Sequence, residues 1–191
     1  MQQRQSAAPA TTAPAAQPAM MTAPDLAVRP FSGKEFRGAL GAFATGVTVI
    51  TTQGAEHAYG MTANAFSSVS LDPPLVLVCI ITGTEGAATI ARNAAFAVNI
   101  LSAEQEAISR YFASRDRPRG RDAFAQVPHR REVTGSPILD GVAAYLDCRL
   151  AASHEAGDHV IFIGEVLALG IEPGLRPLLF HEGRYVSLPD E

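Results

Sequence analysis

The chain has 191 residues, of which 47% are hydrophobic and 18% charged, and this composition is typical of one globular domain with a sizeable core. Its formal net charge of −4 and its pI near 5.7 argue against a nucleic-acid binder, because such proteins neutralise phosphates with clustered Lys and Arg. No run approaches the roughly 18 consecutive apolar residues that a membrane span requires, so we expect a soluble, cytoplasmic protein without a membrane segment.

The N-terminal segment differs from the rest of the chain in composition. Residues 1–28 are mostly Ala, Pro, Gln and Thr without a continuous apolar stretch, which predicts a disordered tail rather than a signal peptide. One domain is then expected over residues 29–191. It should begin with a helix, because residues 32–35 fit a capping box and apolar residues follow at helical spacing until about Ala44.

Extended segments dominate the remainder of the sequence. The β-branched run 47–52 predicts a strand, which should pair across a polar turn with a second strand that leads to residues 60–62. Alternating or continuous apolar patterns predict further strands; they cover residues 67–71, 75–81, 95–101, 142–153, 160–171, 178–180 and 184–186. Because hairpins join most of these strands, the pattern favours an antiparallel barrel over a doubly wound sheet.

Two short helices and one long loop are expected between the strands. One helix should run from Gly83 to Ile90, and another from a capping box at residues 102–105 to Phe112. Residues 114–137 are rich in Arg, Pro and Gly, which predicts an irregular segment of the length that often covers a functional site. We interpret its arginines as a solvated loop, because acidic residues, Pro and Gly interrupt them.

The sequence lacks the motifs of several common sites. It contains neither the glycine-rich dinucleotide motif nor a P-loop. Its five histidines lack the spacing of a metal site, so we expect no bound metal. Cys79 and Cys148 both lie in apolar runs, where the thiols of an intracellular protein usually act as small hydrophobic residues.

The segment 60–70 is the most informative part of the sequence. Gly, Ala and Ser make up most of it, and Met, Thr and Asn are among the others. Small side chains let backbone N–H groups approach a ligand closely, while hydroxyls and an amide supply donors, a combination that suits a flavin ring. The alternative is an edge strand whose small residues pack against another chain.

Four parts of the sequence carry a resemblance to a known family; they are residues 43–52, 60–70, 96–101, and 157–159 followed by 164–166. Together they are similar to the flavin reductase family, the small reductase components of two-component flavin monooxygenases. The resemblance extends from about Phe31 to Leu188. It implies a mainly β fold with a few short helices, the antiparallel split β-barrel of that family.

The resemblance also implies which residues contact the two nucleotides. Those that correspond to the family's flavin contacts are Thr62, Ala63, Asn64, Ala65, Phe66, Ser67, Ser68, Cys79, Ile80, Phe112, Ala113 and Ser114. Those on its nicotinamide side are Thr45, Gly46, His159, Gly183, Arg184 and Tyr185. His159 is the expected catalytic residue, which would orient the nicotinamide or stabilise charge on the reduced flavin. The alternative for His159 is a turn residue bonded to nearby backbone.

One loop departs from the family pattern. Many relatives carry Lys or Arg near the position of Thr84 or Glu85, where it can meet the flavin phosphate, whereas residues 83–86 here read Gly-Thr-Glu-Gly. Backbone N–H groups of this turn and of the helix that follows could still hold an anion beside Thr84. Glu85 would oppose it, so riboflavin, FMN and FAD all stay open at this point.

The activity that the resemblance implies is that of an NAD(P)H:flavin oxidoreductase. Such an enzyme passes hydride from NADH or NADPH to FMN or FAD and supplies reduced flavin to a separate monooxygenase. A homodimer is implied as well, because the family's flavin cleft lies at a subunit edge. Two alternatives stay open: a flavoprotein that retains its flavin and reduces another acceptor, and a flavin carrier without turnover.

Overall fold

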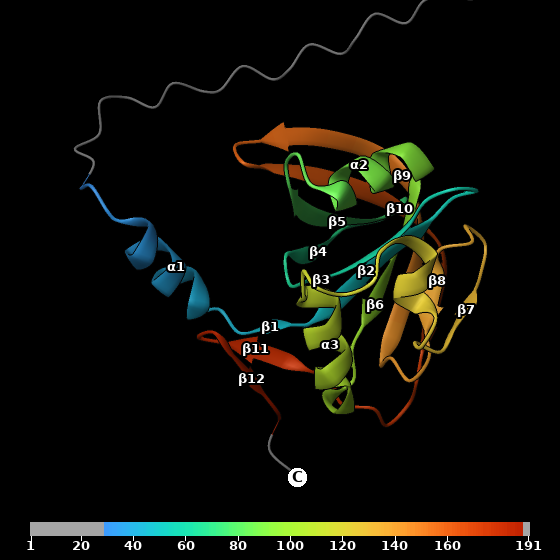
Figure 1. Ribbon diagram of the computed structural model, residues 1–191. Coiled ribbons are helices and arrows are strands. Elements are labelled where there is room, and N and C mark those ends of the chain that lie inside the picture. The colour runs from blue at the N-terminus through green and yellow to red at the C-terminus, as the bar shows by residue number, and fades with distance from the viewer. Residues whose placement is uncertain (1–28, 189–191) are drawn as a thin grey trace, which may run out of the picture. The chain divides into compact units, whose positions relative to one another are not determined.

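The computed structural model describes residues 29–188, so the tail predicted over residues 1–28 lies outside the described residues. The folded unit begins at Gly33 (Figure 1). Its helices are α1 (Gly33–Gly41), α2 (Glu85–Asn93) and α3 (Glu106–Ala113), with the 3-10 helices η1 (Ala103–Gln105) and η2 (Gly120–Phe124). Its strands are β1 (Thr45–Gly46), β2 (Thr48–Gln53), β3 (Ala58–Ala63), β4 (Phe66–Leu71), β5 (Pro74–Ile81), β6 (Ala95–Ile100), β7 (His129–Arg131), β8 (Pro137–Leu139), β9 (Ala144–Ala156), β10 (His159–Ile171), β11 (Leu179–His181) and β12 (Arg184–Val186). Within residues 29–188, every helix is too short or too polar to cross a bilayer.

Seven strands form one antiparallel sheet in the order β3-β2-β6-β9-β10-β5-β4. β3 and β4 lie at its two opposite edges, although only Asn64 and Ala65 separate them in the chain. A link of this length reaches only about 11 Å, so the sheet curves until its two edges approach each other. The described strands show no ladder between β3 and β4. The fold is therefore the predicted antiparallel split barrel, and its opening is the seam between these two strands.

The hairpin of β9 and β10 delivers a predicted site residue to one end of β5. Each of its strands has 13 residues, and the turn between them uses Gly157, whose φ of +63° lies in the left-handed region that favours glycine. β10 pairs with β5 in a register that places His159 opposite Ile81. The Thr82 N–H donates to Asp158 O at 2.9 Å. His159 therefore lies beside the loop that leads into α2.

Two segments differ from the sequence-based prediction. The strand expected over residues 47–52 begins one residue later, as β2 at Thr48, and an unpredicted short strand, β1, precedes it. The Val47 N–H donates to Leu178 O (3.0 Å), and β1 pairs with β11 in a smaller sheet, β1-β11-β12. The segment 114–137 is not wholly irregular, since it contains η2 and also β7, which pairs with β8. A buried Asn99 holds β8, because its Oδ1 accepts from the Leu139 N–H at 2.8 Å. This contact joins residues 40 positions apart, so no local pattern indicates it.

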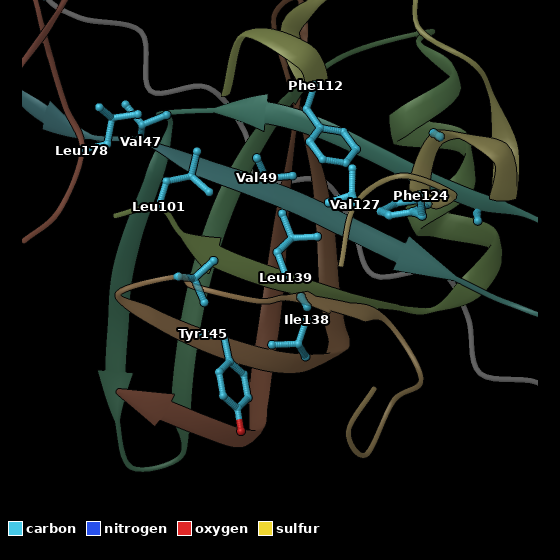
Figure 2. Packing of buried hydrophobic residues seen from close by; sticks show 14 residues of the cluster. Val47, Val49, Leu101, Phe112, Phe124, Val127, Ile138, Leu139, Tyr145 and Leu178 are labelled. Carbon is cyan, nitrogen blue, oxygen red and sulfur yellow. The ribbon is translucent and has the colours of Figure 1, made fainter. Parts of the chain in front are cut away.

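The core occupies both faces of the sheet, because neighbouring residues of a strand point to opposite sides. Val49 belongs to one buried cluster together with Phe112 and Phe124 (Figure 2). Ile50 belongs to a second cluster together with Phe96. α3 and η2 pack against β3, whereas α2 packs against β2 and β3. β3 is thus supported by three short helices, while α1 has no buried residue.

Candidate active site

A cavity of about 290 Å³, here called the seam cavity, opens where β3, β5, the start of α2 and the start of β10 meet. The residues that line it are Tyr59, Met61, Thr62, Ala63, Asn64, Ala65, Cys79, Ile80, Ile81, Thr84 and His159. All of them except Tyr59, Met61 and Ile81 are residues that the sequence predicts for the flavin or nicotinamide site. The fold therefore gathers residues from four separate parts of the chain around one space.

The wall of the seam cavity consists of small side chains on an exposed sheet edge. β3 pairs with β2 alone among the described strands, so every second N–H and C=O group of β3 points away from the sheet. Ala63 and Ala65 have no side chain long enough to cover those groups. Met61 and Ile81 add apolar surface beside them. A flat ligand can therefore lie against the strand and use its backbone.

Three side-chain hydrogen bonds hold this wall in place. Thr48 Oγ1 donates to Ala63 O at 2.6 Å, and Thr62 Oγ1 donates to the carbonyl of Ser109 in α3 at 2.6 Å. Asn64 Nδ2 donates to Thr45 Oγ1 at 3.2 Å. The Thr62 hydroxyl therefore donates to α3 and cannot donate to a ligand. The backbone of this residue, rather than its side chain, faces the seam.

His159 enters the seam cavity as the first residue of β10. Its Nδ1 lies 2.7 Å from Asp158 Oδ1, and this hydrogen bond is the main reason that the pKa of Asp158 is lowered from its ordinary value. The imidazole is thus oriented by a carboxylate rather than by backbone. Its Nε2 has no partner within residues 29–188, and 38% of the side chain is exposed. A ligand in the cavity can therefore reach the second ring nitrogen.

A second space, the apolar cavity, lies on the other side of Asn64, Ala65 and Cys79 and has a volume of about 630 Å³. The remaining residues that line it are Leu40, Phe43, Ala44, Thr45, Gly46, Thr48, Phe66, Ser67, Leu77 and Ile100. It contains Thr45 and Gly46, which the sequence predicts on the nicotinamide side, as well as Phe66 and Ser67. The structure therefore separates Thr45 and Gly46 from His159 by one shared wall.

Comparison with known proteins decides which family has this arrangement. Residues 40–189 match the family described as flavin reductase like domain. The chain belongs to the flavin reductase-like family. It is 42% identical over 159 residues to an NADH-dependent FAD reductase of Streptomyces globisporus, a match that covers 83% of this chain and 87% of that protein. It is 38% identical over 160 residues to the reductase subunit of a flavin-dependent monooxygenase of Mycobacterium tuberculosis, covering 83% of each.

A solved structure of the family also matches this fold. The NADH:FAD oxidoreductase of Streptomyces globisporus in complex with NAD and FAD fragments superposes with a TM-score of 0.77 at 37% identity, over 85% of this chain and 98% of that one. The split barrel and the family predicted from the sequence are thus confirmed.

The seam cavity of this flavin reductase-like chain has the chemistry that an isoalloxazine ring requires. The ring needs flat apolar contact on its face and hydrogen-bonding groups at its edge. Ile80, Ile81 and Met61 supply the first, and the open edge of β3 supplies the second. The residues present therefore fit a flavin.

Several predicted residues line neither cavity; they are Ser68, Phe112, Ala113, Ser114, Gly183, Arg184 and Tyr185. Phe112 is 1% exposed and packs in the core behind β3 rather than over the seam. The Tyr185 hydroxyl lies 2.8 Å from Oγ of Ser109, the residue whose carbonyl accepts from Thr62. A nucleotide role for these residues stays a prediction.

A third space, the arginine cavity, shares Tyr59 and Thr84 with the seam cavity and has a volume of about 300 Å³. Its other lining residues are Gly60, Glu85, Arg115, Arg117, Pro118, Arg119, Gly120 and Ala123. Arg115 and Arg119 are exposed, as predicted for a solvated loop, whereas Arg117 is half-buried and donates to Gly60 O of β3. The sequence offers no periodic signal for the cavity, because loop 114–120 is joined to β3 and α2 through residues distant along the chain.

Proposed function

We propose that this chain is an NAD(P)H:flavin oxidoreductase that reduces FMN or FAD and supplies the reduced flavin to a separate monooxygenase. The observation that carries the proposal is the seam cavity, where the wall of β3 and the oriented His159 face the same space. The names of the relatives support it, since they are NADH-dependent flavin reductases and the reductase subunit of a monooxygenase.

The cofactors supply the redox chemistry, in which a hydride passes from the nicotinamide to the flavin. The protein has to hold the two rings together and exclude water. Thr62 presents the backbone groups that bind the flavin edge, and the bond of its hydroxyl to Ser109 O keeps them at fixed positions. Ala63 and Ala65 leave room beside Thr62, and their own carbonyls accept from Thr48 Oγ1 and from the Cys79 N–H. The ring nitrogen of His159 that Asp158 leaves unpaired orients the carboxamide side of the nicotinamide.

A homodimer is part of the proposal. Large apolar side chains are exposed on α1 and around it and at the far end of β10: Phe43 is 76% exposed, Leu40 58%, Leu169 60% and Ile171 74%. Exposed apolar groups of this kind mark contact surfaces between proteins. The two cysteines are free thiols, which supports a reducing compartment such as the cytoplasm.

Continuous turnover of free flavin is the test. Purified protein is mixed with NADH or NADPH and an excess of riboflavin, FMN or FAD, and nucleotide oxidation is followed by its absorbance. Oxidation well beyond one equivalent of enzyme is the expected result. Absence of turnover with every flavin, together with tight flavin binding, would instead identify a carrier.

Flavin retention distinguishes the remaining alternative. Gel filtration of the protein after loading with flavin is expected to release the flavin, because a reductase that serves a separate monooxygenase must let it go. Reduction of a single equivalent that stays with the protein through the column would support a flavoprotein that reduces another acceptor.

A further inference from the structure

The small sheet β1-β11-β12 presents two hydroxyl groups on one of its faces. Thr45 of β1 pairs with Phe180 of β11, and Phe180 pairs in turn with Tyr185 of β12. Residues directly opposite each other in antiparallel strands point to the same face of a sheet. Thr45 and Tyr185 therefore flank Phe180 on one face, and both of their hydroxyls have partners outside the small sheet.

The first of these hydroxyls bonds the wall of the seam cavity directly. Thr45 Oγ1 accepts from Asn64 Nδ2 at 3.2 Å. Asn64 is one of the two residues that join β3 to β4, and both of its neighbours, Ala63 and Ala65, line the seam cavity. Strand β1 therefore restrains the wall at the point where the chain leaves β3.

The second hydroxyl is connected to the wall through helix α3. The Tyr185 hydroxyl lies 2.8 Å from Ser109 Oγ, and the carbonyl of the same serine accepts from Thr62 Oγ1 at 2.6 Å. One residue of α3 thus bonds β12 with its side chain and the wall with its backbone. Ser109 is fully buried, so removing the Tyr185 hydroxyl leaves a polar group unpaired inside the protein, which is more costly than losing an exposed hydrogen bond.

The packing of the Tyr185 ring fixes the position of its hydroxyl. The ring makes an edge contact with Phe180, with the two ring centres 5.3 Å apart, and both residues pack against a buried core cluster. The guanidinium of Arg110 lies over the Tyr185 ring, 4.7 Å from its centre, and Glu106 holds that guanidinium with an ion pair of 2.7 Å. The hydroxyl is therefore held at Ser109 by contacts to the rest of the ring.

Tyr185 lies behind the wall rather than in a ligand space. It does not line the seam cavity, the apolar cavity or the arginine cavity, and its side chain is half-buried. Its hydroxyl has a partner in the protein, the buried Ser109. The geometry therefore connects Tyr185 with the flavin side of the wall, at Thr62, and not with an open position for a nicotinamide.

We propose that Tyr185 is a positioning residue for the flavin-binding wall, acting through Ser109 on Thr62, and that the small sheet restrains the wall at both Thr62 and Asn64. The proposal rests on the proposed function, because it concerns the wall that receives the flavin ring. It gives Tyr185 an indirect role in flavin binding in place of the direct nicotinamide contact that the family resemblance implies. Since the wall meets the ring that all flavins share, riboflavin, FMN and FAD should be affected equally.

The experiment measures dissociation constants for riboflavin, FMN and FAD by quenching of flavin fluorescence, and the KM for NADH at saturating FMN. Tyr185→Phe removes only the hydroxyl, and it is expected to weaken the binding of all three flavins about threefold, because one buried hydrogen bond behind the wall is lost. The KM for NADH should stay within about twofold. Ser109→Ala removes the other partner of the same bond, so the double variant should bind flavin no more weakly than either single variant.

Tyr111→Phe is the matched control. Tyr111 belongs to the same helix, and its hydroxyl donates to Ala123 O at 2.9 Å, so this variant also loses one hydrogen bond between α3 and another part of the chain. That bond leads to η2 and not to the wall. Tyr111→Phe should therefore lower the denaturation midpoint in urea much as Tyr185→Phe does, while all three flavin dissociation constants stay unchanged.

The Thr62→Val background tests the path from Tyr185 to the wall. This substitution keeps the branched shape of the side chain and removes the bond to Ser109 O. If Tyr185 acts through Thr62, adding Tyr185→Phe to Thr62→Val should weaken flavin binding no further. The full threefold loss of affinity in that background would show that the effect does not pass through Thr62, and it would overturn the proposal.

Other outcomes would also contradict the proposal. A raised KM for NADH with unchanged flavin binding in Tyr185→Phe would make Tyr185 a nicotinamide contact. An equal loss of flavin affinity in Tyr111→Phe would reduce the effect to a general loss of stability. A wild-type protein that bound no flavin would defeat the proposed function as well, whereas a wild-type protein that reduced flavin, with unchanged flavin binding in Tyr185→Phe, would defeat this inference alone.

Discussion

β3 and loop 114–120 both line the arginine cavity but are fixed in different ways. The wall is set by strand register: β3 pairs with β2 over its whole length, and Thr48 and Ser109 bind it from both sides. The loop is set by individual arginine contacts, such as the bonds of Arg117 to Gly60 O and of Arg119 to Glu85 Oε2. The wall therefore depends on a regular strand ladder, whereas the loop depends on a few single side-chain contacts.

Phe112→Ala should have the largest effect, because Phe112 supports the wall from the core. The substitution empties a site that is 1% exposed and packed 5.5 Å from the centre of the Phe124 ring, so the free energy of unfolding should fall by about 3–5 kcal/mol in urea titrations. Val133→Ala, at a position 65% exposed, should change it by less than about 0.5 kcal/mol. A small loss of stability with a large loss of flavin binding would instead place Phe112 over the ligand.

Gly60→Ala should have the next largest effect, because Gly60 lies where the wall and the loop meet. An added Cβ would lie 2.6 Å from Phe112 Cε1 and 3.0 Å from Phe124 Cζ, so we expect a loss of about 1–3 kcal/mol of unfolding free energy from overpacking. Gly38→Ala, whose Cβ would meet open space, is the control. A Gly60→Ala variant as stable as the wild type would show that the Phe112 and Phe124 rings can move to make room for the added methyl group.

His159→Ala tests the nicotinamide side of the wall. Loss of one hydrogen bond should raise the KM for NADH about tenfold while the dissociation constant of FMN stays within twofold. His154→Ala, on the same hairpin but facing solvent, should change neither value. Weaker FMN binding with an unchanged KM for NADH would mean that His159 belongs to the flavin site.

The two cysteines give the smallest expected effect. Burial raises the pKa of the Cys148 thiol to about 12, so at pH 8 it should resist alkylation until the protein unfolds. Cys79 is half-buried in the wall shared by the seam and apolar cavities, and saturating FMN should slow its alkylation several-fold. Mass spectrometry of the labelled peptides measures both rates. Equal labelling of Cys79 with and without FMN would place the flavin away from this wall.

The sequence predicts the parts of the molecule that depend on local patterns. The periodicity of segments such as 75–81 and 160–171 indicates β5 and β10 almost to the residue, and the small residues of segment 60–70 indicate the wall. The arginine cavity could not be predicted, because Arg117 and Gly60 lie 57 positions apart and Arg119 and Glu85 lie 34 apart. Such contacts depend on tertiary packing, which leaves no periodic trace in the chain.

A crystal structure of the protein with FMN bound tests the account most directly. The account predicts the isoalloxazine ring in the seam cavity, against the wall of Thr62, Ala63 and Ala65, with His159 beside it. A ring in the apolar cavity beside Phe43, away from His159, would contradict it.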